Sequence, residues 1–137
     1  MSEQTVIVHH SSNRPVSELF AFLADHNNLS KVFLLPVTRI KDGLTEPNGI
    51  GSVRRLGPPG VGVEETVSAL ITNELIEYRI TRNGGPIKDH NGRLDFSATA
   101  DGSELQWTIN FRSPVPLLGP AIKAILTTAI SMGLKRI

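Results

Sequence analysis

The C-terminal segment, residues 117–137, constrains the fold of this chain more than any other stretch. Its apolar residues recur at the spacing of one helix face. Two prolines precede the segment, where a missing backbone N–H is harmless, and two basic residues end it, where the helix dipole favours them. A helix of about 20 residues is about 30 Å long. We therefore expect one helix over residues 115–136, and such a helix needs a large apolar surface to lie on.

A membrane-spanning helix is the competing interpretation of this segment. Lys123 falls inside the apolar run, Gly119 and Pro120 disturb its start, and hydroxyl side chains dilute the rest. We therefore expect a helix that is docked on the core of the protein, and no membrane span.

The preceding residues supply the apolar surface, because most of them alternate between apolar and polar side chains. The predicted strands are residues 4–10, 37–41, 52–56, 61–72, 74–82, 90–100 and 105–111. Residues 15–24 and 29–34 are predicted as two short helices between the first two strands. Turn residues separate the later strands, and the Asp101-Gly102 pair is typical of a hairpin.

This order of elements predicts the fold class. Consecutive hairpins indicate an antiparallel sheet with one buried face. A single long helix must cover that face, so the sheet must curl around it. We therefore predict an α+β fold in which a strongly curved antiparallel sheet is wrapped around the long C-terminal helix. No repeat or linker divides the chain, and residues 1–137 are predicted to form a single domain.

Charge and cysteine content narrow the range of partners. The chain has 14 Lys and Arg against 13 Asp and Glu, a net charge of +1, so we expect no nucleic-acid partner. The absence of cysteine excludes disulfides, thiolate metal sites and a thiol nucleophile. The polar N-terminus lacks the apolar core of a signal peptide, and we expect a cytoplasmic protein that is a monomer or a weak homodimer.

Several short segments, taken in order along the chain, carry a resemblance to a known family. They are Arg14-Pro15-Val16, Leu23-Ala24-Asp25-His26-Asn27, Gly49-Ile50-Gly51-Ser52-Val53-Arg54, Glu64-Glu65-Thr66-Val67 and Gly133-Leu134. In this order the chain resembles the START-like (SRPBCC) helix-grip superfamily, most closely its polyketide cyclase/dehydrase-like branch. The resemblance implies a hydrophobic cavity between the sheet and the C-terminal helix. Members bind lipids, sterols, polyketides or other apolar molecules there, and only some are enzymes.

Glu65 is the sharpest candidate for chemistry. It shares a strand face with Val67 and Ala69, which would point its carboxylate into an apolar space. There the pKa of the carboxyl should rise, and the group could act as an acid or a base. In the structural interpretation, which we favour, Glu65 instead pairs with Arg54 or Arg55.

His90 and Tyr78 are the other candidates for acid–base chemistry. His90 is in phase with Leu94 and would face the cavity, as would Tyr78, whereas His26 follows the first helix and is expected to make a turn hydrogen bond. No spacing typical of a metal site, a phosphate-binding loop or a nucleophile elbow is present, so no metal and no cofactor is expected.

The inward faces of the predicted strands and helix define the expected lining of the cavity. The predicted ligand-binding residues are Glu65, Val67, Ala69, Tyr78, His90, Leu94, Phe96, Trp107, Ile109, Phe111, Ile122 and Leu126. The leading hypothesis is a protein that binds, or binds and transports, a hydrophobic or amphipathic small molecule such as a lipid, sterol or polyketide.

Two other functions remain open. One is a cyclase or dehydratase that uses Glu65 with His90 or Tyr78, and the other is a protein-interaction module with a vestigial cavity. An open apolar cavity would support binding, a buried unpaired Glu65 would support the enzyme, and a cavity filled by side chains would support the interaction module.

Overall fold

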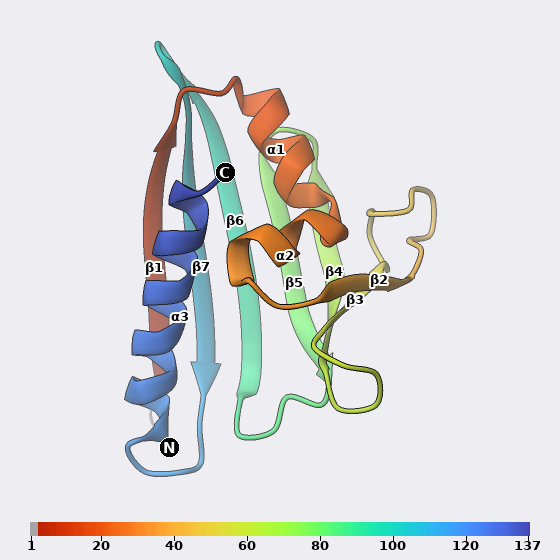
Figure 1. The fold of residues 1–137 in the computed structure, drawn as a ribbon, viewed down its shortest axis with the longest axis vertical. Helices are drawn as coiled ribbons and strands as arrows, with labels where there is room; N and C mark the ends of the chain where they lie inside the picture. Colours follow the sequence, from red (N-terminus) through yellow and green to blue (C-terminus); the bar gives the residue numbers. More distant parts are fainter. Residues whose placement is uncertain (1–2) are drawn as a thin grey trace.

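Residues 3–137, which the computed structural model describes, contain seven strands in a single antiparallel sheet (Figure 1). In chain order the strands are β1 (Glu3–Ser12), β2 (Val37–Lys41), β3 (Val53–Leu56), β4 (Val63–Ile71), β5 (Leu75–Arg82), β6 (Lys88–Thr99) and β7 (Gly102–Arg112). Their spatial order is β1-β7-β6-β5-β4-β3-β2. Strands β2 to β7 therefore neighbour one another in sequence order, while β1 pairs with the last strand.

The helices lie on one side of this sheet (Figure 1). Helix α1 (Val16–Ala24), the short 3-10 turn η1 (His26–Asn28) and α2 (Leu29–Phe33) follow β1, and α3 (Leu118–Lys135) comes last. The short strands β2 and β3 run crosswise to the long strands, so the sheet curves toward the helices. This architecture confirms the predicted α+β fold with its curved antiparallel sheet, its two short helices and its long C-terminal helix.

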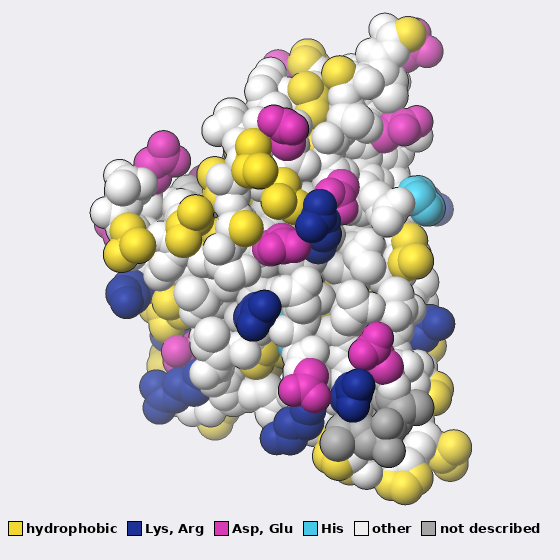
Figure 2. Space-filling view, turned by 180° about the vertical axis from the view of Figure 1, so that it is seen from behind, with side chains coloured by type: hydrophobic (Ala, Val, Ile, Leu, Met, Phe, Trp, Pro, Cys, Tyr) yellow, Lys and Arg dark blue, Asp and Glu magenta, His cyan; other side chains and the backbone are white. Residues whose placement is uncertain are grey.

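The strands follow the alternation of the sequence. On β7 the apolar residues Leu105, Trp107, Ile109 and Phe111 are all buried, whereas the residues between them are exposed or half-buried. Figure 2 shows the molecule from the opposite side to Figure 1, where basic and acidic side chains are interspersed. The sheet thus has one face in the core and one in water.

Helix α3 is buried unevenly along its length. It begins at Leu118 rather than at residue 115, because Leu117 adopts a left-handed backbone conformation with φ of 68°. Ile130 and Leu134 near its C-terminal end are fully buried, whereas Leu126 is half-buried and Ile125 is 66% exposed. The C-terminal half therefore anchors the helix, and the N-terminal half is left with less packing beneath it.

Close contact between α3 and α2 fixes this anchored end. Gly133 lies against the backbone carbonyl of Val32, and a side chain at this position would overlap with that carbonyl. Arg136 Nη2 donates a 2.8 Å hydrogen bond to the same carbonyl oxygen. Carbonyls at a helix end have no partner within their helix, so Arg136 satisfies a group that α2 alone leaves unpaired.

We expect Gly133→Ala to destabilise the protein by about 1–3 kcal/mol in urea denaturation, because the added methyl group would push α3 away from Val32. Alanine favours helix by about 1 kcal/mol over glycine, so helix propensity alone predicts the opposite sign. Gly119→Ala in the same helix is the matched control, because its new methyl group would meet only the flexible Gln4 side chain, at 3.1 Å. Equal effects of the two changes would contradict the close contact.

Candidate functional site

A cavity of about 240 Å³ lies between the inner face of the sheet and helices α2 and α3. Most of its wall is apolar, and strands β3 to β7 contribute the majority of the lining. The lining residues are Phe33, Leu35, Leu56, Val63, Glu65, Tyr78, Ile80, Ile87, His90, Ile109 and Leu126. This cavity lies under the N-terminal half of α3, which explains why Leu126 is only half-buried.

The structure brings some of the predicted ligand-binding residues to this cavity and places others in the core. Glu65, Tyr78, His90, Ile109 and Leu126 line it. The remaining inward-facing residues pack into the hydrophobic core instead, and these are Val67, Leu94, Phe96, Trp107, Phe111 and the half-buried Ile122. Ring contacts with the helices, such as those between Phe20 and Phe96 and between Phe33 and Trp107, explain this division.

Ala69 does not line the cavity, although the alternation of the sequence places it on the same face as Val67. A bulge interrupts β4 between the two residues: Val67 pairs with Tyr78, but Ala69 pairs with Glu77. The extra residue reverses the phase of the strand. Leu70 therefore packs against the core in place of Ala69.

Glu65 forms a buried ion pair with Arg54, which settles the choice between Arg54 and Arg55. The two residues face each other across β3 and β4, and Arg54 Nε donates a 2.8 Å hydrogen bond to Glu65 Oε1. Arg54 is 3% exposed and Glu65 is 8% exposed. Arg55 instead donates to the backbone carbonyl of Gly57. The favoured structural interpretation of Glu65 thus has a specific partner.

His26 extends this pair into a chain of hydrogen bonds. Arg54 Nη1 lies 3.1 Å from His26 Nδ1, His26 Nε2 lies 2.7 Å from Ser52 Oγ, and Ser52 Oγ donates to the Gly49 carbonyl at 2.6 Å. Because the guanidinium can only donate, Nδ1 must accept and Nε2 must carry the proton. Burial, followed by the charges of Arg54 and Arg39, lowers the pKa of His26 to about 3. A neutral imidazole is the form that this chain requires.

His26 has a larger structural role than the turn hydrogen bond that the sequence predicts for it. The residue is fully buried and links the loop after α1 to the Arg54–Glu65 pair. Its position in a polar loop gave no periodicity from which burial could be inferred. The one feature of the sequence that could have indicated a buried partner is Arg54, because a cation on the inner face of a strand needs hydrogen-bond partners from other parts of the chain.

Tyr78 is held in place by three neighbours. The Arg54 guanidinium lies 4.5 Å from the centre of its ring, and Trp107 Nε1 donates a 2.8 Å hydrogen bond to its hydroxyl. The ring also covers Gly92 on the neighbouring strand, where any side chain would overlap with it. Burial, followed by the Glu65 charge, raises the pKa of Tyr78, so the phenol remains protonated.

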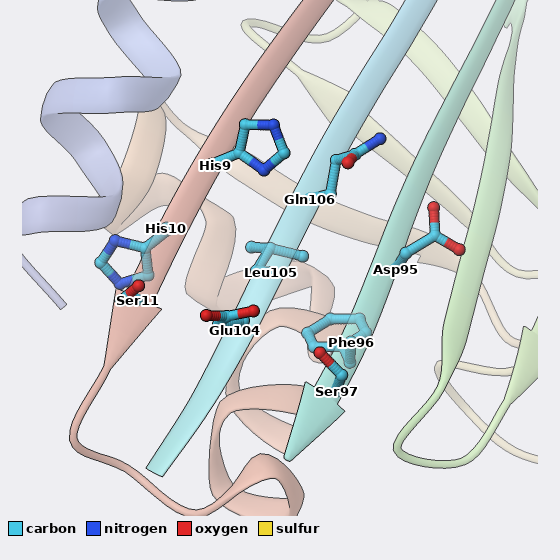
Figure 3. A pocket seen from close by; sticks show the side chains of 9 residues that line it. All are labelled: His9, His10, Ser11, Asp95, Phe96, Ser97, Glu104, Leu105 and Gln106. Carbon is cyan, nitrogen blue, oxygen red and sulfur yellow. The ribbon is translucent and has the colours of Figure 1, made fainter. Parts of the chain in front are cut away.

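A second hollow, of about 360 Å³, lies on the sheet near the end of β1 (Figure 3). Figure 3 shows His9, Gln106 and Asp95 side by side across β1, β7 and β6, and the pairing of these strands places them in one row. Because Leu105 and Phe96 on the same strands point into the core, this row belongs to the outer, solvated face. The hollow is polar and lies apart from the apolar cavity.

Two further properties concern residues 3–137. No three His, Cys, Asp or Glu side chains in this range are grouped in a way that could hold a metal ion. Within the same range, every helix is too short or too polar to cross a membrane.

Comparisons with known proteins bear on the same fold. A family model described as polyketide cyclase / dehydrase and lipid transport matches residues 3–137. No curated protein matches the sequence. The crystal structure of Ara h 8.0201 aligns with a TM-score of 0.70 at 16% identity, over 98% of this chain and 96% of that chain. A protein from Nitrosospira multiformis aligns with a TM-score of 0.74 at 16% identity, over 96% and 93%. These two structures support the fold alone.

We expect Glu65→Ala to destabilise the protein by about 3–5 kcal/mol in denaturant melts, because it leaves the buried Arg54 charge unpaired. Glu65→Gln should cost less, since the amide oxygen still accepts a hydrogen bond. Glu64→Ala is the matched control: its partner, Arg82, is 3.7 Å away and 67% exposed, so we expect at most about 1 kcal/mol. A Glu65→Ala variant as stable as Glu64→Ala would contradict the structural role.

His26 predicts a pH dependence of stability. The unfolded chain protonates His26 near pH 6.5, whereas the folded protein resists protonation until about pH 3, so the unfolded state binds more protons in this window. Stability should fall as the pH drops through it, by about 1.4 kcal/mol per pH unit from this residue. His26→Gln, which keeps a donor and an acceptor but does not titrate, should flatten the profile by that amount. Parallel profiles for both proteins would contradict the buried neutral histidine.

Proposed function

Because the chain belongs to the polyketide cyclase / dehydrase and lipid transport family, we propose that it binds a hydrophobic or amphipathic small molecule in the cavity under α3. The observation that carries this proposal is an apolar space of about 240 Å³ left open between well-packed layers. Side chains that line such a space lack contacts on one side, and this lowers stability. A ligand that fills the cavity restores those contacts.

The size of the cavity limits what it can enclose. Apolar cavities of about 150 Å³ bind benzene, so a cavity of about 240 Å³ has room for roughly ten non-hydrogen atoms. A single ring with a short substituent, or a short acyl chain, meets this limit. A complete sterol or a long polyketide would extend beyond the mouth, past the rim residue Leu35, which is 38% exposed.

The state of the acidic and phenolic groups favours binding over acid–base catalysis. Glu65 is paired with Arg54, and Tyr78 accepts a hydrogen bond from Trp107 while burial keeps it protonated. A general base needs a free acceptor atom within reach of the substrate proton, and the acceptor nitrogen of His90, Nδ1, is already bonded to the Ile80 N–H. The open cavity likewise favours ligand binding over an interaction module in which side chains would fill the same space.

We expect cumene, a single ring with a branched substituent, to bind the protein and to shift NMR signals of the lining residues. Leu126→Trp should weaken this binding at least about tenfold, because the larger side chain takes the room of several ligand atoms. Ile125→Trp is the matched control: it is the neighbouring residue on α3, but it is 66% exposed and does not line the cavity. Equal weakening in both variants, or no binding to the wild type, would contradict the proposal.

A further inference from the structure

A bulge in β6 lies next to His90. Lys88 pairs with Arg112 and Asn91 with Asn110, so two residues of β6, Asp89 and His90, lie opposite one residue of β7. Asp89 takes up the irregularity with a left-handed φ of 50°. Bulges of this kind redirect side chains and are frequent beside binding sites. His90 keeps the inward phase of Leu94 on the same strand and lies beside this bulge, at the wall of the cavity.

A backbone hydrogen bond fixes the tautomer of His90. The pairing of β5 with β6 ends at Tyr78 and Gly92, and the next inward residue on β5, Ile80, donates its N–H to His90 Nδ1 at 3.1 Å. A nitrogen that accepts a hydrogen bond carries no proton, so in the neutral ring Nε2 must be the N–H donor. Burial lowers the pKa of His90, which favours this neutral form.

The Nε2–H group of His90 has unused bonding capacity. No group among residues 3–137 forms a hydrogen bond with Nε2, and the surrounding protein does not fully enclose this atom. The ring lines the cavity beside Tyr78, at 5.5 Å between ring centres. The other two polar lining residues each have one partner: Glu65 Oε1 accepts from Arg54, and the Tyr78 hydroxyl accepts from Trp107. The cavity thus presents an apolar wall with a neutral donor in it.

We propose that this cavity selects neutral ligands with a hydrogen-bond acceptor, such as a carbonyl oxygen, which accepts from His90 Nε2–H. The inference rests on the proposed function, and it adds the class of ligand. A ligand with an anionic group at the same position would lose its hydration in a mainly apolar cavity, where the nearest cation, Arg54, is already paired with Glu65. A purely apolar ligand would fill the cavity but leave the donor unpaired.

Two probes of nearly equal size test this inference, because acetophenone carries a carbonyl oxygen where cumene carries a methyl group. Their dissociation constants are measured by NMR titration for the wild type, His90→Leu and the matched control Ile87→Leu, which changes an apolar wall residue. We expect the affinity of acetophenone relative to cumene to fall about tenfold in His90→Leu, because the buried carbonyl loses its donor. Ile87→Leu should leave this ratio unchanged.

The outcomes separate this inference from the proposed function. If neither probe binds the wild type, the proposed function fails. If cumene binds but the ratio is the same in the wild type and in His90→Leu, the role of His90 is wrong. If His90→Leu does not fold, histidine-selective ¹H–¹⁵N NMR of the wild type decides: Nε2 should carry the proton and shift with acetophenone but not with cumene, and a proton on Nδ1 would overturn the inference.

Discussion

The buried guanidinium of Arg54 is the constraint on which the curved end of the sheet depends. A charge on the inner face of a sheet is unfavourable unless it is paired and hydrogen bonded. Here Glu65, the neutral ring of His26 and the face of Tyr78 together surround it. These partners come from β4, from the loop after α1 and from β5, so satisfying one side chain draws three separate parts of the chain together. The crosswise strands β2 and β3 are held to the long strands at this point.

The same interaction determines the character of the cavity. Arg54 occupies one oxygen of Glu65 and covers the ring of Tyr78, and Trp107 occupies the hydroxyl of Tyr78. Both polar side chains are therefore hydrogen bonded to other residues of the protein, and the wall of the cavity remains mainly apolar. Side chains held in this way lose little further freedom when a ligand arrives, which reduces the entropic cost of binding. Stability and the proposed binding thus depend on one set of contacts.

How far the sequence predicts this arrangement depends on whether a feature is periodic. Alternation along β7 and helical spacing in α3 yield the fold, because burial on one face leaves a regular signature. The phase of β4 beyond Val67 could not be predicted, since a bulge adds one residue without any signal in composition and moves Ala69 off the inner face. His26 was missed for a related reason: its partners, Arg54 and Ser52, are distant in sequence and belong to no repeating pattern.

The polar residues that line the cavity differ in the groups that hold them in place. Glu65 lies opposite Arg54 across β3 and β4, and Tyr78 lies opposite Val67 on one side and Gly92 on the other. His90 lies beside the bulge in β6, where the pairing of β6 with β5 has ended. The backbone N–H of Ile80 therefore donates to the His90 side chain, at Nδ1, instead of to a backbone carbonyl. The bond that orients the imidazole therefore also leaves its second nitrogen with a proton to donate. The interrupted pairing between β5 and β6 thus leaves a hydrogen-bond donor, His90 Nε2–H, in the mainly apolar wall of the cavity.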